Sequence, residues 1–320
     1  MGISSDSNAL GKLYTKYPTV DVVIPTYNSE TIISRCLEGI KNQQYPGIVN
    51  IIIIDGGSTD RTVEIAKTFH CEIYILPGIY SNGLTGARNI ALKYCHGDLY
   101  WAIDTDNVLI GKDVLYKIVR PFMDIADIHI TLPMTAWERS QHGMDKWLAV
   151  NEQINVGSMA ETCEKKENWL VIRDMSFGLT NASLVRTTSI KEVGGYDSDV
   201  RVLRRMRSKG LSRGVVVLDA FFYHYQAESY IKWLKKLNRR IKMFSSFDYE
   251  YLNKYFEPTS HDHKYQREHL ASLVRSMKNS AIMLKKKRIF FIWGFFFNLG
   301  PLLIFMLHPL KFARTFRRFL

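Results

Sequence analysis

Polar and acidic residues follow three short apolar segments in the first third of the chain. They are PTYNSE at 25–30, DGGSTD at 55–60 and DTDN at 104–107. A single cluster of this kind is most simply a turn or a helix cap. Three clusters, each at the end of an apolar run, instead indicate side chains gathered for chemistry.

The cluster with the clearest chemistry is Asp104-Thr105-Asp106. Alternate residues at the end of a strand leave on the same side, so both carboxylates would face one site. Two close carboxylates repel each other unless a cation lies near them. Hard oxygen ligands suit Mg²⁺ or Mn²⁺, which complete their shells with phosphate oxygens and water. The pattern predicts a divalent metal that stabilises the charge on a leaving diphosphate.

The segments between these clusters predict alternating strands and helices. We expect strands at 20–25, 49–55, 72–76 and 98–104, and helices at 29–43, from a cap at 58–60 to about 69, and at 83–95. Strands with two apolar faces are typical of a parallel sheet covered by helices. Ligands bind beyond the carboxyl ends of such strands, where the three clusters fall.

After residue 127 the pattern is looser. Strands are expected at 128–134 and 215–225 and a helix near 184–192, whereas 140–170 gives no clear assignment. The four cysteines show no metal-ligand spacing, which predicts free thiols in a reducing compartment.

The segments VVIPTYNSE, IIIIDGGSTDRT, GARNIA and IDTDN, in this order and spacing, resemble the family-2 inverting glycosyltransferases of the GT-A fold. FGLTN at 177–181 with LVR at 184–186 resembles the acceptor-side segment of that family, and GGYD at 194–197 its GGFD turn. The resemblance implies an α/β fold with a mostly parallel, Rossmann-like sheet flanked by helices. It implies a catalytic domain over 1–226, with a nucleotide-sugar half at about 20–107 and an acceptor half at 108–226.

The resemblance also implies roles for residues of the donor half. Pro25, Thr26 and Tyr27 would border the nucleobase pocket, with Glu30 near it and Asp55 hydrogen-bonding the base.

Further residues are implied around the diphosphate. Arg88 would lie beside the nucleotide, Asp104 would reach the ribose or the metal, and Asp106 would bind the Mg²⁺ or Mn²⁺ directly. His224 matches a histidine that approaches the metal or the diphosphate in the family. Its alternative is a packed histidine between two tyrosines.

The general base is less directly matched. Family members usually carry Glu-Asp after GGFD, followed by a helix that ends in Arg-x-x-x-x-Gly. Counting back from Gly210, Arg205 falls on the usual arginine and Asp199 on the usual aspartate, whereas Ser198 replaces the glutamate. Asp199 would then remove the proton of the acceptor hydroxyl, with Asp197 as the second candidate. An acceptor that is already a phosphate would scarcely need a base.

The C-terminal third carries the excess positive charge. The net charge is +12, and Lys and Arg crowd into 201–245, 264–288 and 311–320. IKWLKKLNRRIKMFS at 231–245 predicts a basic amphipathic helix in a membrane interface, or alternatively a surface helix packed on the catalytic domain. KKKR at 285–288 precedes the uncharged stretch 289–307, which is long enough to cross a bilayer once.

We therefore expect residues 227–320 to form a helical membrane-attachment region on the cytoplasmic face of a membrane, with membrane lipids as partners. Both a single span and a shallow hairpin broken at 298–301 fit the sequence; the hairpin keeps both basic ends on one side.

The expected reaction is sugar transfer, with inversion, from a UDP- or GDP-sugar to a membrane-associated acceptor such as a polyprenyl phosphate or lipid-linked saccharide. One alternative is an inactive nucleotide-sugar-binding module, which Ser198 favours. A nucleotidyltransferase is the other, although PTYNSE lacks the glycine-rich basic phosphate loop that it would need. Nucleic acid is not an expected partner, because the basic residues flank an apolar stretch.

Overall fold

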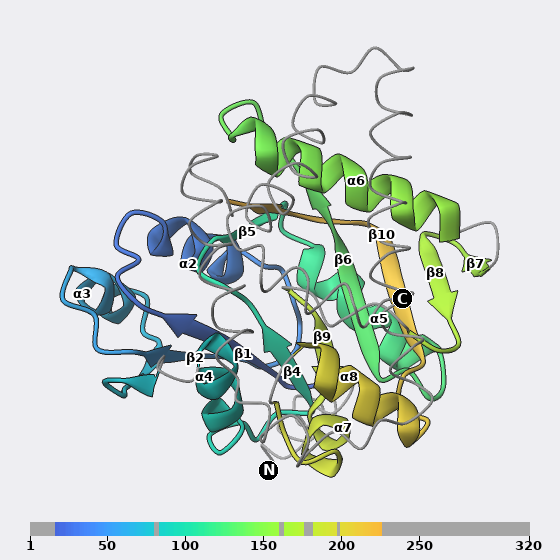
Figure 1. Cartoon of the computed structure of the whole chain (residues 1–320), viewed down its shortest axis with the longest axis horizontal. Coiled ribbons are helices and arrows are strands. Elements are labelled where there is room, and N and C mark those ends of the chain that lie inside the picture. The colour runs from blue at the N-terminus through green and yellow to red at the C-terminus, as the bar shows by residue number, and fades with distance from the viewer. Residues whose placement is uncertain (1–16, 80–82, 160–162, 176–181, 197–198, 226–320) are drawn as a thin grey trace, which may run out of the picture. The chain divides into compact units, whose positions relative to one another are not determined.

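A computed structural model of the chain is shown in Figure 1; the structure describes residues 17–79, 83–159, 163–175, 182–196 and 199–225. The predicted membrane segments at 231–245 and 289–307 lie outside these residues. Within the described ranges, no helix is long and apolar enough to cross a membrane. The chain divides into two units, one of residues 1–135 and 160–224 and the other of residues 136–159 and 225–320.

Four strands of the first unit form a parallel array. They are β1 (Val20–Thr26), β2 (Val49–Asp55), β3 (Glu72–Ile75) and β4 (Leu99–Ala102), which lie in the order β3-β2-β1-β4. Every residue of the central strand β1 is buried, as expected for a parallel strand covered on both faces. The predicted strands of the nucleotide-sugar half are therefore confirmed.

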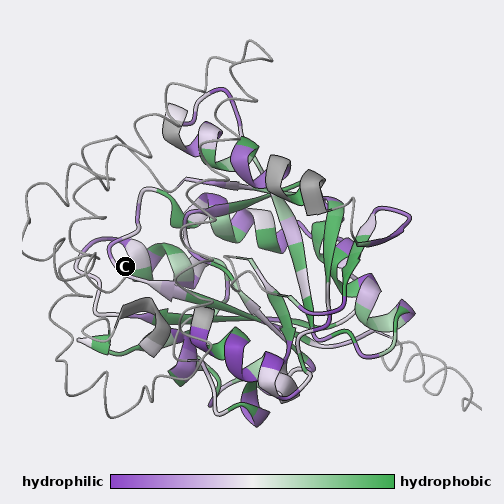
Figure 2. Cartoon of the chain, turned by 45° about the vertical axis from the view of Figure 1, so that its right-hand side comes forward, coloured by the Kyte–Doolittle hydropathy of each residue, from purple (hydrophilic) through white to green (hydrophobic). Residues whose placement is uncertain are grey.

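Three helices connect these strands: α2 (Ile33–Lys41), α3 (Thr62–Thr68) and α4 (Gly83–Ala91). Helix α2 shows why this sequence is helical, because Ile33, Cys36, Leu37 and Ile40 are all buried at spacings of three and four residues. The strands are hydrophobic along most of their length, whereas the helices alternate hydrophobic and hydrophilic residues (Figure 2).

The rest of the sheet is antiparallel where its pairing is defined, so the sheet as a whole is mixed, and the expected parallel arrangement holds for its core of β3, β2, β1 and β4. The strands of this part are β5 (Asn107–Ile110), β6 (Ile130–Ala136), β7 (Glu164–Lys166), β8 (Trp169–Ile172), β9 (Leu184–Arg186) and β10 (Gly214–His224). The helices between them are α5 (Val114–Asp124), α7 (Thr187–Glu192) and α8 (Asp199–Ser208). Beyond β4 the order is β9-β6-β10-β8-β7, and β5 pairs with β10. The two-residue turn between β7 and β8 explains one reversal, because only antiparallel neighbours can be joined so closely.

One expectation for this region was wrong, and one unassigned segment now has its elements. The segment 184–192 is not one helix, because Leu184 and Val185 are buried and pair with Trp101 and Tyr100 of β4 before α7 begins. The unassigned segment 140–170 holds β7, the start of β8, and in the second unit helix α6 (Gly143–Met159).

All four cysteines are free thiols, as the sequence predicts. Cys36 and Cys95 are buried, and Cys71 and Cys163 are partly buried.

Candidate functional site

The loops after β1 and β2 are joined by hydrogen bonds between their side chains and backbones. Asn28, in the left-handed region at φ +46°, donates its N–H to Ser58 Oγ at 2.9 Å and accepts the Thr59 N–H at 2.9 Å. The Glu30 N–H donates to Asp60 Oδ2, and Glu30 Oε2 accepts the Arg61 N–H, each at 3.1 Å. Two of the three predicted clusters thus form one surface.

The third cluster joins the same edge of the sheet. Thr105 Oγ1 lies 3.3 Å from Ser29 Oγ, which links the turn after β4 to the loop after β1. The expectation that the clusters gather at the carboxyl ends of the parallel strands is confirmed in geometry.

Asp55 organises the loop that follows β2. The fully buried carboxylate accepts the Gly57 and Ser58 N–H groups at 2.9 and 2.8 Å and the Ser58 hydroxyl at 2.5 Å. A carboxylate offers about four lone-pair sites, so these three bonds leave one for another donor. The hydrogen bond from Asp55 to a nucleobase stays a prediction. In the structure the same carboxylate shapes the loop that follows β2.

The residues predicted to border the nucleobase differ in exposure. Pro25 and Thr26 are buried in β1, opposite Ile54 and Asp55 of β2. Tyr27 follows them with 54% of its surface exposed. Tyr27 is therefore the exposed member of this group.

The Asp104–Asp106 segment is a turn rather than the end of an extended strand. Strand β4 ends at Ala102, and the Asn107 N–H donates to the Asp104 carbonyl at 3.0 Å. The buried Asn107 side chain accepts the Asp104 N–H at 3.1 Å and closes the turn from the other side. Asn107, which has no predicted role, is thus the residue that shapes the acidic turn.

The two carboxylates of this turn have different surroundings. Asp104 Oδ1 accepts a hydrogen bond from Arg88 Nη2 at 2.6 Å, and the Arg88 side chain is only 3% exposed. Burial raises the pKa of Asp104 and the charge of Asp106 adds to this, whereas Arg88 and His224 oppose it. Arg88, expected beside the nucleotide, is placed as the buried partner of Asp104.

His224 reaches the turn because β10 pairs with β5. In that antiparallel register His224 lies opposite Asn107, and its Nε2 is 3.5 Å from Asp106 Oδ1. The ring also lies 6.3 Å from that of Phe222, centroid to centroid. The imidazole therefore packs in the sheet and still directs a nitrogen at the acidic turn.

These residues fit a metal that a substrate helps to hold. In the described part of the chain, no three His, Cys, Asp or Glu side chains are grouped to bind a metal ion by themselves. Asp104, Asp106 and His224 are not a ready-made set, because Asp104 is engaged by Arg88. Asp106 and His224 offer an oxygen and a nitrogen, and Mg²⁺ or Mn²⁺ usually adds phosphate oxygens and water to one or two carboxylates.

The predicted base lies at the border of the described residues. Asp199 is the first residue of α8, but its side chain, Asp197 and the 177–181 segment lie outside the described part. Arg205 of α8 donates to the Val193 and Gly195 carbonyls, each at 2.7 Å. Arg205, which matches the arginine of the family motif, thus holds the turn at 193–195 that precedes the predicted base.

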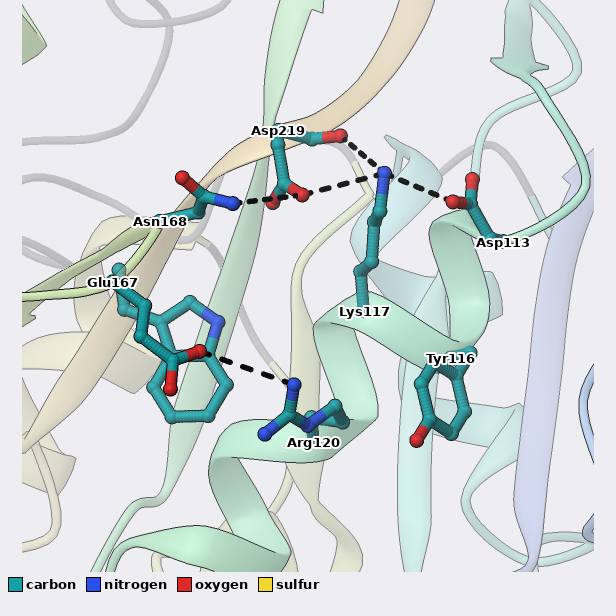
Figure 3. Close-up of a pocket in the computed structure, with 8 residues that line it drawn as sticks. Asp113, Tyr116, Lys117, Arg120, Glu167, Asn168 and Asp219 are labelled. Atoms are coloured by element: carbon teal, nitrogen blue, oxygen red, sulfur yellow. Dashed lines mark hydrogen bonds and ion pairs between the residues drawn. The ribbon is translucent and has the colours of Figure 1, made fainter.

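A separate pocket lies among α5, the β7–β8 turn and β10 (Figure 3). Lys117 Nζ contacts Asp113 at 3.0 Å and Asp219 at 3.3 Å, and Arg120 lies 3.9 Å from Glu167. None of the predicted site residues lines this pocket. Its charges pair with one another and fasten α5 to the neighbouring strands.

Known proteins resemble the chain in sequence and fold. The model of the family "Glycosyl transferase family 2" matches residues 21–152. An N-acetylglucosaminyltransferase of Bradyrhizobium elkanii is 30% identical over 126 residues, covering 38% of this chain and 69% of the relative. One from Rhizobium sp. (strain N33) is 33% identical over 150 residues, covering 43% of this chain and 33% of the relative. The chain belongs to glycosyltransferase family 2.

A solved structure has a similar fold. It is the mannosyltransferase PcManGT from Pyrobaculum calidifontis in complex with GDP-Man and Mn²⁺, with a TM-score of 0.50 and 14% identity over 89% of this chain and 88% of the other. At this identity the similarity extends to the GT-A-like fold alone. The match to the Rhizobium relative spans about a third of that protein's length.

Proposed function

We propose that this protein transfers a sugar, with inversion, from a UDP- or GDP-sugar to a membrane-associated acceptor, and that it requires Mg²⁺ or Mn²⁺. The observation that carries the proposal is the Asp104–Asp106 turn, with His224 against it, at the edge where three loops converge. The names of the relatives support N-acetylglucosamine as the first sugar to test. Mn²⁺ with GDP-mannose in the structural neighbour supports a metal-bound diphosphate.

Each residue has a defined part in this proposal. Asp106 and His224 would hold the metal, which supplies Lewis-acid stabilisation of the leaving diphosphate. Arg88 fixes Asp104 within the turn. Asp199, or Asp197, takes the proton of the acceptor hydroxyl while the oxygen of that hydroxyl forms a bond to the anomeric carbon. The bond from that carbon to the diphosphate oxygen breaks, and its electron pair leaves with the nucleoside diphosphate.

The first experiment is a scan of UDP- and GDP-sugars with Mn²⁺, read by thermal stabilisation and by release of nucleoside diphosphate. We expect one sugar class to raise Tm and to be hydrolysed slowly, with both effects lost in EDTA. Binding without any turnover, with or without acceptor, would favour the inactive nucleotide-sugar-binding module. The absence of stabilisation by every nucleotide sugar would overturn the proposal.

We propose a polyprenyl phosphate or a lipid-linked saccharide as acceptor, at the cytoplasmic face of a membrane. The support is the basic sequence at 231–245 and the uncharged stretch 289–307 behind KKKR. Truncation before Lys285 should ease extraction without detergent while nucleotide binding survives. The remaining attachment through 231–245 should weaken with salt, because each basic residue near an anionic surface contributes about 1 kcal/mol and is screened.

A cysteine at Thr315 distinguishes the two membrane topologies. The hairpin places it on the side of the catalytic domain, so an impermeant thiol reagent should label it there. Labelling from the opposite side only would establish a single span. Complete solubility of the full chain without detergent would exclude membrane attachment.

A further inference from the structure

Helix α4 contacts both the acidic turn and the segment that leads to the predicted base. Arg88 and Asn89 are consecutive residues of this helix. Arg88 binds Asp104 at 2.6 Å, and Asn89 Oδ1 accepts the N–H of Tyr196 at 2.9 Å. One turn of helix therefore connects residues that are 92 positions apart in sequence, Asp104 and Tyr196.

The contact between Asn89 and the Gly194–Tyr196 turn is close. A Cβ on Gly195 would lie 2.3 Å from Asn89 Oδ1, and Gly195 has φ +90°. A side chain at this position would both clash and strain the backbone. Glycine thus lets the turn approach α4 closely enough for the Tyr196 N–H to reach Asn89.

Aromatic packing reinforces the same junction. Tyr196 is 1% exposed, and its ring centroid lies 5.5 Å from the Arg88 guanidinium carbon. The Tyr100 hydroxyl donates to the Arg88 carbonyl at 3.1 Å, and the Tyr100 and Tyr196 rings are 6.3 Å apart. The Arg88–Tyr196 hydroxyl contact is longer, at 3.5 Å. The bond from Asn89 to the backbone is therefore the specific link, and the rings fill the space around it.

The far side of the turn is held by α8 itself. Arg205 donates to the carbonyls of Val193 and Gly195, so the turn is fixed to α8 through its carbonyls and to α4 through an N–H. Only two residues separate Tyr196 from the first residue of α8. The position of α4 thereby sets where α8 begins.

We infer that Asn89 is a positioning residue, which places the start of α8, and with it the predicted base, relative to the Asp104–Asp106 turn. The effect of Asn89 on turnover rests on the proposed function, whereas its placement of the start of α8 does not. Asn89 would act on deprotonation of the acceptor and not on donor binding. Arg88 provides the opposite end of the same link, at Asp104.

The first test is hydrogen–deuterium exchange of the full chain without ligand. Asn89→Ala should speed exchange across 193–205 by up to roughly 10-fold, as expected for loss of one partly buried hydrogen bond, and leave 99–107 unchanged. Asn89→Asp retains an oxygen acceptor and should behave as wild type. Asn168→Ala, the same change in an exposed turn, is the matched control. Unchanged exchange at 193–205, or an equal rise in both segments, would overturn the inference.

The second test separates kcat from KM, with the nucleotide sugar that the donor scan identifies and, as acceptor, a lipid-linked saccharide, whose hydroxyl must lose a proton. Asn89→Ala should lower kcat for transfer by roughly 10- to 100-fold, because small misplacement of reacting groups is costly. Donor KM and slow donor hydrolysis should stay within about twofold of wild type. Rescue by Asn89→Asp is expected, whereas loss of donor affinity together with kcat would contradict the inference. If the wild-type chain binds no nucleotide sugar, the proposed function fails, and the exchange experiment still decides the role of Asn89.

Discussion

Loops in the parallel half of the sheet, β3-β2-β1-β4, are held mainly by side-chain oxygens that accept backbone N–H groups. Asp55 binds two such groups after β2, and Asp21 and Asp98 bind those of Gly97 and Thr19 at the opposite strand ends. In the antiparallel half, cationic side chains donate to backbone carbonyls instead. Arg186, Arg205 and Arg213 bind the carbonyls of Ile128, Gly195 and Ala126, among others.

This difference bears on how a diphosphate could be held. Many nucleotide-binding sheets cradle phosphates with free N–H groups at a helix N-terminus. Here the N–H groups that lead into α3 already donate to side-chain oxygens; they belong to Gly57, Ser58, Thr59, Arg61 and Thr62. A loop whose donors are used and whose surface is acidic favours a metal-bound diphosphate. The comparison therefore favours glycosyl transfer through the Asp106 turn over a phosphate-loop nucleotidyltransferase.

The largest expected effect comes from the acidic turn of the parallel half. Asp106→Ala should reduce transfer by about 10³-fold or more and abolish metal-dependent binding of nucleoside diphosphate, since a metal contributes several kcal/mol to charge stabilisation. Calorimetric titration of Mn²⁺ with UDP or GDP present measures the binding. Asp124→Ala, on an exposed face of α5, is the control. Metal dependence that survives in Asp106→Ala would exclude this turn as the metal site.

An effect confined to turnover, without loss of metal-dependent binding, is expected at the start of α8 in the antiparallel half. Asp199→Asn should cut turnover by roughly 10²–10⁴ and leave donor binding nearly intact, the usual contribution of a general base. Steady-state kinetics of Asp199→Asn and Asp197→Asn side by side decide between them. If only Asp197→Asn is impaired, the base is Asp197. Full activity in both variants would indicate a phosphate acceptor.

The parallel half was predictable from sequence because each of its signals is local. Continuous apolar runs mark β1 and β2, a spacing of three and four residues marks α2, and the polar clusters directly follow the strands. Parallel strands bring their carboxyl ends to one edge, so strand direction alone places Asp55 and Asp104 at the same edge of the sheet. The sequence did not reveal that Asp104–Asn107 forms a turn, because that geometry depends on the Asn107 side chain.

The antiparallel half was harder to predict because its elements are short and depend on distant partners. Strand β9 has three residues and is stabilised by pairing with β4 and β6, so its sequence also fitted a helix. Asn89 and Tyr196 meet only after α4 has packed beside the Gly194–Gly195 turn. A motif comparison identifies the GARN and GGYD segments, but it does not reveal the hydrogen bond between Asn89 and Tyr196 that joins them.

The comparison also predicts which half loses more stability when its loop contacts are removed. Asp55→Ala should cost about 2–4 kcal/mol, because three donors lose a fully buried acceptor. Arg205→Ala should cost about 1–2 kcal/mol, since water can reach the carbonyls of a partly buried site. Urea unfolding of both variants measures the difference. A larger loss for Arg205→Ala would reverse the ranking of the two kinds of contact.

The smallest effect concerns pH and His129, between α5 and β6 in the antiparallel half. Burial, and next the charge of Arg186, lower the pKa of His129 below its usual 6.5. The unfolded chain therefore binds more protons than the folded chain as pH falls from about 7 to 5, so this residue lowers stability across that window. His142 in the second unit shifts in the same direction, so wild type must be compared with His129→Gln. The difference in unfolding free energy between wild type and His129→Gln should change by less than about 1 kcal/mol from pH 7 to pH 5, with wild type losing more. If the unfolding free energies of the two proteins changed equally with pH, protonation of His129 would have no effect on stability.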